Sequence, residues 1–308
     1  MDESRLRVLD VLTRDSGRSQ DETLDGVWQR YRRERDSGLS PLVAAVLVAS
    51  QVDRLGFAFA VGYPAALERL FVGVRLPAAL CVTESGGNSP RAIETRLEPH
   101  GVGYRLTGKK TFVTFGSRAT TLIVAATLGL KPSGKPDLAV VQIPAGRDGI
   151  VLEDLPEIAF VPEVPHASVR FDQVDVRADE ILPGDGYLDY VKPFRTIEDI
   201  HVLAATLGHL VGLARRSDTS AGLIAKMTEK LLSLEHLLEG APLDPRVHIA
   251  LHGIYAGVTE LLETQSFAEL LEARPTDERR RWERDKPLLE VASLAREKRF
   301  ERAQQLLR

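Results

Sequence analysis

A polar loop between apolar segments is the first stretch of this sequence whose residues could do chemistry. Six residues that favour turns, Ser85-Gly86-Gly87-Asn88-Ser89-Pro90, follow the short apolar run from Ala79 to Thr83. Such residues end a strand rather than continue it. A loop that offers N–H and hydroxyl donors beside apolar strands can hold a flat ligand with a polar edge.

The stretch from Tyr104 to Ser117 forms the second part of this candidate site. Its apolar residues flank the basic segment Gly108-Lys109-Lys110, and this pattern predicts a hairpin that turns at those three residues. The apolar run from Leu122 to Ala126 predicts a further strand. The region therefore reads as a strand, a loop, a hairpin and a second strand.

Histidine and cysteine residues make a weaker case for chemistry. His248 and His252 are four residues apart on a predicted helix, a spacing that can place two imidazoles on one metal ion. No glutamate follows His248 as a metalloprotease motif requires, so we expect no metal site and place both histidines on a polar helix face or at an interface. The one cysteine, Cys81, lies among apolar residues and is expected to pack in a core.

The composition is that of an ordinary globular chain. The 308 residues suffice for two or three domains, and the apolar fraction of 44% and the charged fraction of 27% are in the usual range. A formal net charge of −4 without a long basic tract argues against nucleic acid as the main partner. A single cysteine, an acidic start and no apolar run long enough to cross a membrane predict a cytoplasmic protein.

Three segments of the chain differ in their periodicity. Residues 1–76 have apolar residues at helical spacing, and Ser40-Pro41 is typical of a helix start. Residues 77–185 contain short strands separated by Gly and Pro, which favours a small β-barrel or sandwich. Residues 186–308 return to helices, among them a long apolar one from Ile197 to Arg216, another from Arg246 to Leu271 and a last one from Asp277 to Leu306. We therefore expect an α+β fold with an N-terminal helical domain, a middle β domain and a C-terminal helical bundle.

The middle segment resembles the middle domain of the acyl-CoA dehydrogenase family. That family carries T-E-x-x-x-G-S-D and, further on, G-x-K-x-[WF]-[IV]-T-N-G before an apolar strand. Asn88, Pro90 and Phe115 depart from this pattern, and a second block from Val164 to Val176 resembles a later strand pair of the family. The resemblance extends over about Leu80 to Arg215, and the residues in register are Thr83, Glu84, Ser89, Gly108, Lys110, Phe112, Val113, Thr114 and Gly116.

The resemblance implies FAD as the cofactor. It places Val82 and Thr83 at the flavin ring, Ser89 at the cofactor or the acyl thioester, and Phe112 and Thr114 along the flavin. A flavin has nitrogen and oxygen edges that need backbone and hydroxyl donors, and a face that needs an aromatic or apolar wall. The alternative interpretation is that these residues only stabilise the fold.

The reaction of the family also needs a carboxylate that takes a proton from the carbon next to a thioester. Many members carry this base in a C-terminal E-G-T segment, which we do not find here. A minority carry it in an E-R-x-x-x-A-x-x-x-G pattern, and Glu198 keeps the glutamate of that pattern, with Gly208 at the matching distance. Glu198 is therefore the predicted base, although Asp199 replaces the arginine that assists substrate binding. The alternative is that Glu198 and Asp199 stabilise a helix start through its dipole.

Two motifs that help the family hold FAD are missing. The region of the R-x-x-F-G motif reads Arg216-Ser217-Asp218-Thr219-Ser220, and no Q-x-x-G-G-x-G segment occurs. Two hypotheses of different classes follow. The first is a flavin-dependent oxidoreductase that acts on an acyl thioester or related acyl compound. The second is a non-catalytic binding or scaffold subunit that has lost FAD. Flavin-dependent hydroxylation on the same fold is a third possibility, which no residue favours.

The expected partners are a small acyl substrate and further protein subunits. The long helix from Ile200 to Leu213 is so apolar that another surface should cover it, and Leu231, Leu234, Leu237 and Leu238 would add apolar area. We therefore expect a homodimer or homotetramer, or a pairing with a homologue, and we expect no nucleic acid or membrane partner.

Overall fold

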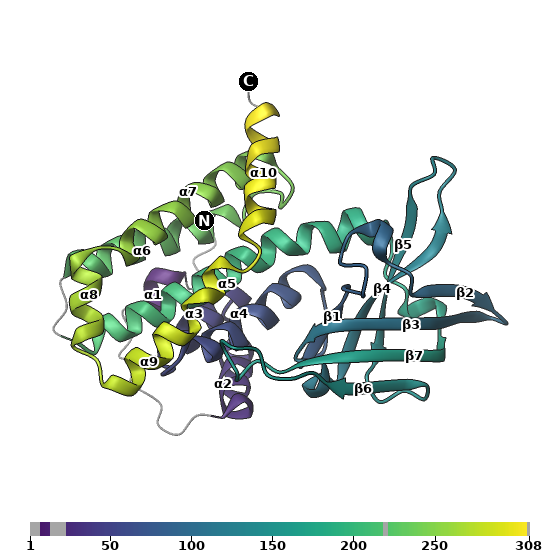
Figure 1. The fold of residues 1–308 in the computed structure, drawn as a ribbon, viewed down its shortest axis with the longest axis horizontal. Helices are drawn as coiled ribbons and strands as arrows, with labels where there is room; N and C mark the ends of the chain where they lie inside the picture. Colours follow the sequence, from purple (N-terminus) through teal and green to yellow (C-terminus); the bar gives the residue numbers. More distant parts are fainter. Residues whose placement is uncertain (1–6, 13–22, 218–220, 307–308) are drawn as a thin grey trace. The chain divides into compact units, whose positions relative to one another are not determined.

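The computed structural model describes residues 7–12, 23–217 and 221–306, and the chain forms two compact units (Figure 1). The helical unit contains Met1–Arg69, Ala159–Glu163 and Thr196–Arg308, and the β unit contains Leu70–Ile158 and Val164–Arg195. The α+β class predicted from the sequence is confirmed. The structure places the first and last helical segments in one unit, and their division into separate domains stays a prediction.

The first part of the helical unit contains four helices: α1 (Val8–Leu12), α2 (Leu24–Asp36), α3 (Pro41–Ala49) and α4 (Leu55–Leu70). Helix α3 begins as the sequence predicts. The Ser40 hydroxyl accepts a hydrogen bond from the Val43 N–H at 3.4 Å, and Pro41 occupies the first turn, where its missing N–H costs nothing. Eight of the nine residues of α3 are buried, which explains its apolar character on every side.

The remaining helices follow the β unit along the chain. A π-helical turn, η4 (Gly186–Val191), leads into α5 (Lys192–Arg215), and the later elements are α6 (Ala221–Leu237), α7 (Pro245–Leu262), α8 (Gln265–Glu272), α9 (Thr276–Asp285), the 3-10 helix η5 (Lys286–Glu290) and α10 (Ser293–Leu306).

Two of the expected helices are broken where the sequence analysis had them continuous. The expected helix from Arg246 to Leu271 is divided between α7 and α8, because the Thr264 hydroxyl accepts the Phe267 N–H at 3.3 Å and starts a new helix. The expected last helix begins at Thr276 rather than at Asp277, and it is divided at η5, where Pro287 has no N–H to donate to an α-helical turn.

Helix α5 is covered by helices of the same chain. A Cβ atom at Gly208 would lie 2.8 Å from the Val46 carbonyl oxygen of α3, and one at Gly62 of α4 would lie 3.0 Å from the His201 carbonyl oxygen of α5. These glycines let the backbones approach closely. Among the described residues, the segment Gly186–Arg215 is long and apolar enough to cross a membrane, but 89% of its most apolar window is buried, as in the core helix of a soluble protein.

The sequence predicted that a partner subunit would cover α5. Helices of the same chain cover it instead, so α5 gives no reason to expect a partner. Leu231 and Leu234 of α6 are also fully buried, so the expectation that they offer exposed apolar area is wrong. Both errors have the same cause, because the sequence does not show which helices of the chain face each other.

The β unit is built on one mixed sheet of seven strands. They are β1 (Ala78–Cys81), β2 (Arg96–His100), β3 (Gly103–Thr114), β4 (Thr121–Leu130), β5 (Pro136–Pro144), β6 (Ile150–Asp154) and β7 (His166–Val176). Their order is β1-β4-β2-β3-β7-β6, with β5 paired to β4. Strand β4 runs parallel to β1 and β2, and the other pairs are antiparallel. Two short helical turns, η1 (Pro90–Ala92) and η2 (Gly116–Arg118), lie between strands, and a third, η3 (Ala178–Glu180), follows β7.

The hairpin expected at Gly108-Lys109-Lys110 is wrong, because these residues lie within the single strand β3. The chain turns earlier, between β2 and β3, where His100 pairs with Gly103. Gly108 is explained by close packing instead of a turn. A Cβ atom there would lie 2.6 Å from the Cα of Thr95, so only glycine fits this position.

The chain returns to the helical unit for five residues, Ala159–Glu163, between β6 and β7. The Val161 N–H donates to the Asp285 carboxylate at 2.8 Å, and Glu163 pairs with Arg54 and Arg284, each at 3.3 Å. Asp285 is fully buried, and the Arg284 guanidinium at 2.7 Å and the Val161 N–H together satisfy a charge that water does not reach.

Two buried histidines of α5 should make the protein sensitive to acid. Burial lowers the pKa of both His201 and His209 to about 4, from an ordinary value of about 6.5. The unfolded chain takes up these protons below about pH 6.5 and the folded chain only near pH 4, so the free energy of unfolding falls across that interval. We expect a loss of about 3 kcal/mol per histidine between pH 6.5 and 4, seen as a falling midpoint of urea denaturation.

A double variant, His201→Gln with His209→Gln, separates this effect from the titration of carboxylates. Its free energy of unfolding should depend less steeply on pH than that of the parent protein. His236→Gln is the matched control, because the His236 side chain is 77% exposed. Equal slopes in all three proteins between pH 6.5 and 4 would contradict the prediction.

Candidate functional site

Four of the five residues predicted to contact a flavin lie together at one end of the sheet in the β unit. Val82 and Thr83 directly follow β1, and Phe112 and Thr114 lie at the end of β3. The Thr111 N–H donates to the Thr83 carbonyl at 2.9 Å and joins the two segments. Val82 is buried, whereas the side chains of Thr83 and Thr114 are partly exposed.

Phe112 has the most unusual conformation in this group. Its φ is 50°, in the left-handed region that a bulky residue rarely adopts, and its side chain is 62% exposed. The pairing of β3 with β7 shifts between Lys110 and Val113, so Thr111 and Phe112 form an irregular step in the strand. Strained backbone at an exposed aromatic ring is often found at binding sites, which supports the choice of Phe112 as a contact residue.

Ser89 lies further along the loop and is exposed. Its carbonyl accepts the Ala92 N–H at 2.9 Å at the start of η1, and its hydroxyl makes no capping bond there. The loop itself is closed at its other end, where Glu84 and Gly87 exchange two backbone hydrogen bonds of 2.9 Å. The role of Ser89 at a cofactor or thioester stays a prediction.

A buried ion pair that the sequence analysis missed fixes this loop to the sheet. The Lys110 ammonium bonds the Glu84 carboxylate at 2.6 Å and the Val82 carbonyl at 3.3 Å. The same carboxylate accepts the N–H groups of Glu94 at 2.9 Å and Thr95 at 3.1 Å. Burial would raise the pKa of Glu84, but Lys110 and the two N–H groups hold it below its usual value. Two of the motif residues are thus explained by the fold.

The predicted contact residues that take no part in this ion pair have side chains suited to a flavin ring. Two partly exposed threonine hydroxyls, those of Thr83 and Thr114, can donate to a polar edge, and the exposed ring of Phe112 can pack on a flat face. The Val82 carbonyl is already engaged by Lys110, so Val82 can offer only its remaining backbone and its apolar side chain.

Glu198 and Asp199, the acidic pair of the predicted base, lie on α5 in the helical unit. Glu198 is partly buried. Asp199 is buried and pairs with two arginines of α10, with Arg296 at 3.3 Å and with Arg299 more closely. Burial raises the pKa of the Asp199 carboxyl, and the two guanidinium groups oppose this shift. The predicted cleft between Glu198 and the loop of the β unit stays a prediction.

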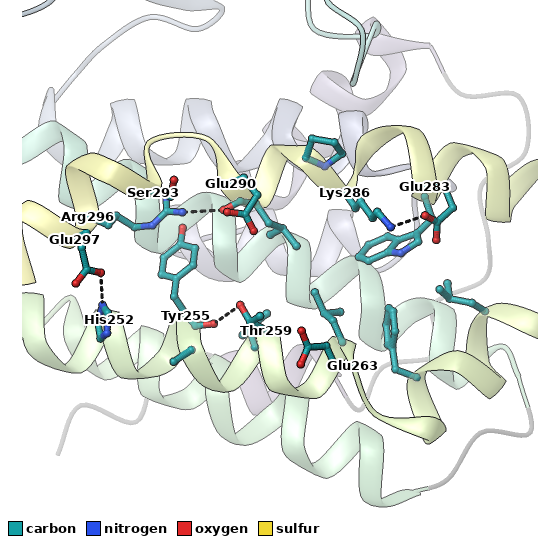
Figure 2. A pocket seen from close by; sticks show the side chains of 18 residues that line it. His252, Tyr255, Thr259, Glu263, Glu283, Lys286, Glu290, Ser293, Arg296 and Glu297 are labelled. Carbon is teal, nitrogen blue, oxygen red and sulfur yellow. Dashed lines mark hydrogen bonds and ion pairs between the residues drawn. The ribbon is translucent and has the colours of Figure 1, made fainter.

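A hollow in the helical unit was not foreseen. It is a cavity of about 550 Å³ between α7 on one side and α9, η5 and α10 on the other (Figure 2). Glu263 and Glu290 project into it from opposite walls. The sequence does not predict this cavity, because the residues of its walls are far apart in the chain. Glu290 is followed by Val291 and Ala292, so it does not match the E-G-T segment of the family.

The two histidines considered as metal ligands have other contacts. The His248 Nε2 lies 3.3 Å from the Thr196 hydroxyl and 3.0 Å from the Pro242 carbonyl oxygen. The His252 ring stacks on Phe300 with centroids 3.7 Å apart. Within the described ranges, no three His, Cys, Asp or Glu side chains are grouped as a metal site requires.

Comparison with known proteins finds similarity in structure. No family model matches the sequence, and no curated protein matches it either. A butyryl-CoA dehydrogenase from Megasphaera elsdenii has a TM-score of 0.63 at 16% identity, with 98% of this chain and 94% of that chain covered. An acyl-CoA dehydrogenase from Geobacillus kaustophilus has a TM-score of 0.62 at 15% identity, with 90% and 89% covered. A prolyl acyl carrier protein oxidase has a TM-score of 0.56 at 18% identity, with 84% of each chain covered.

Proposed function

The chain has an acyl-CoA dehydrogenase-like fold, and from this premise we propose that it is a flavin-dependent oxidoreductase. Its substrate would be an acyl thioester, from which it removes a proton at the α carbon and a hydride at the β carbon. The supporting observation is the group of Thr83, Phe112 and Thr114 at one end of the sheet, which offers two hydroxyls and an exposed aromatic ring. The acyl group could be carried by CoA or by a carrier protein, since one of the similar structures is a prolyl acyl carrier protein oxidase.

Each residue of the proposed site has a stated role. Val82, Thr83, Phe112 and Thr114 would hold the isoalloxazine ring of FAD, and Ser89 would contact the cofactor or the thioester. FAD, when bound, supplies the acceptor for the hydride. The Glu198 carboxylate would take up the α proton, since it keeps the glutamate of the family's minority pattern and is partly buried on α5.

The second candidate function is a non-catalytic subunit with the same fold. It is favoured by Asp199, which stands where the family has a substrate-binding arginine and is committed to Arg296 and Arg299. Through these ion pairs Asp199 links α5 to α10. Its negative charge cannot replace the arginine in binding an anionic substrate. Of the missing FAD motif, residues 218–220 lie outside the described ranges.

The visible absorption spectrum of the purified protein tests the two candidates. An enzyme should show the visible absorption bands of a flavin, with about one flavin per chain, either as isolated or after incubation with FAD and gel filtration. Phe112→Ala should lower the occupancy, whereas Val102→Ala, at an exposed position of the β2–β3 turn, should not. A protein that stays colourless after incubation with FAD excludes the flavoenzyme and leaves the non-catalytic subunit.

We also propose that the protein is cytoplasmic and that it associates into a dimer or tetramer or with a homologue. The support for association is exposed apolar side chains in and beside α10, namely those of Val291, Leu294 and Leu306. Light scattering at micromolar concentration should therefore give at least twice the mass of 33.9 kDa. A monomer mass would contradict the proposed self-association, and Leu294→Glu should shift a true oligomer towards it.

A further inference from the structure

The cavity in the helical unit has the size and lining of a ligand site. Its volume of about 550 Å³ lies within the range of small-molecule pockets. One face of α7 lines it over roughly three turns, from His252 to Glu263, and the segment from Trp282 to Glu297 lines it opposite. Phe267 and Trp282 also line it, meet edge to face with ring centroids 5.4 Å apart, and are buried.

The floor of the cavity is aliphatic. Leu262, Leu271 and Leu289 are partly exposed there, and Pro287 is exposed. Apolar surface of this kind, left open to water in a concave site, is covered favourably by an alkyl or aryl group.

The rim of the cavity is acidic. Glu263, Glu283, Glu290 and Glu297 line it, together with the cations Lys286 and Arg296. Both cations are engaged within the protein. Lys286 bonds Glu283 at 2.5 Å (Figure 2).

Arg296 lines the cavity, and its guanidinium is engaged by several contacts within the protein. It bonds Asp199 at 3.3 Å and the carbonyl groups of Leu289 and Val291 at 2.7 and 2.6 Å, and its guanidinium lies 4.0 Å above the Tyr255 ring. Glu297 lies 3.6 Å from His252. The carboxylates of Glu263 and Glu290, in contrast, have no hydrogen-bond or ion-pair partner anywhere in the described part of the chain.

We propose that this cavity binds an organic cation, an amine or quaternary ammonium that carries an aliphatic chain. The chain of the ligand would cover the leucine floor, and its charge would lie between Glu263 and Glu290, which approach from opposite walls. The inference does not rest on the proposed function. All residues that line the cavity belong to the helical unit, and its acidic rim would repel the phosphate groups of an acyl-CoA thioester.

Calorimetric titration with octyltrimethylammonium tests the proposal, with octanoate and 1-octanol as ligands of similar length and different charge. The cation should bind saturably with a dissociation constant in the millimolar range, and the anion should not bind. The double variant Glu263→Gln with Glu290→Gln should weaken cation binding about tenfold, since two charge contacts are lost. Glu260→Gln, an exposed residue of α7 outside the cavity, is the matched control and should leave binding unchanged.

Salt gives a second measurement that needs no variant. Raising the ionic strength from about 0.02 M to about 0.5 M should weaken binding of the cation to the parent protein and have little effect on the double variant. Equal affinity for octanol and the cation, or no heat with the cation, would overturn the proposal. A dimer in light scattering that persists in the presence of the cation, together with no binding in calorimetry, would also overturn the proposal. A second copy of the chain would then cover the cavity.

Discussion

Lys110→Met should destabilise the β unit by about 3–5 kcal/mol, because it leaves the Glu84 carboxylate buried without its counter-charge. The Lys110 side chain is fully buried and that of Glu84 is 7% exposed, so water cannot replace the lost partner. The variant should show a lower midpoint in urea denaturation followed by circular dichroism, and a melting temperature lower by roughly 6–20 °C.

Two further variants separate this ion pair from general effects of substitution. Lys109→Met removes the neighbouring charge, which is exposed, and should leave stability within about 0.5 kcal/mol of the parent. Adding Glu84→Gln to Lys110→Met should recover part of the loss. The amide oxygen of the new side chain can still accept the N–H groups of Glu94 and Thr95, and no buried charge remains. If the double variant is less stable than Lys110→Met alone, the pair does not act as described.

Glu198→Gln should lower the rate of acyl-thioester oxidation by about two to four orders of magnitude if Glu198 is the base. The substitution keeps the shape of the side chain and removes its ability to take up a proton. The measurement is the loss of flavin absorbance after anaerobic mixing with an acyl thioester. The flavin content and the melting temperature of the variant should equal those of the parent.

Two other carboxylates serve as comparisons for Glu198→Gln. Asp199→Asn should lower the rate less, because this carboxylate is committed to Arg296 and Arg299 and its loss acts through stability. Glu290→Gln should leave the rate unchanged. A large loss in Glu290→Gln with full activity in Glu198→Gln would assign the proton transfer to the cavity of the helical unit and would reject both the proposed base and the inferred cation site.

The features that local sequence determines could be predicted. The cap of α3 depends on Ser40 and Pro41, which are adjacent, and the order of helices, strands and helices follows from periodicity. The breaks at Thr264 and Pro287 are local features that were missed, and the other errors are non-local. Gly108 reads as a turn residue until Thr95 is seen packed against it, and Leu231 reads as exposed until its neighbours are known.

The site divides in the same way. The residues around Thr83 and Phe112 were chosen because the family pattern keeps their spacing, and their role at a flavin stays a prediction. The contact between Lys110 and Glu84 joins residues 26 positions apart, and no periodicity marks it. The cavity was missed for a related reason, because its walls come from helices whose facing sides are set by packing.

The five-residue excursion Ala159–Glu163 has a consequence for dissecting the protein into fragments. A recombinant β unit cut at 70 and 195 would carry Glu163 away from Arg54 and Arg284. A helical fragment without those five residues would keep Asp285 buried and lacking the Val161 N–H that it accepts. Because a fragment cut at 70 and 195 takes with it five residues that belong to the helical unit, the helical fragment is not expected to reach its native stability alone, and swaps of the β unit between related proteins should leave residues 159–163 with Arg54, Arg284 and Asp285.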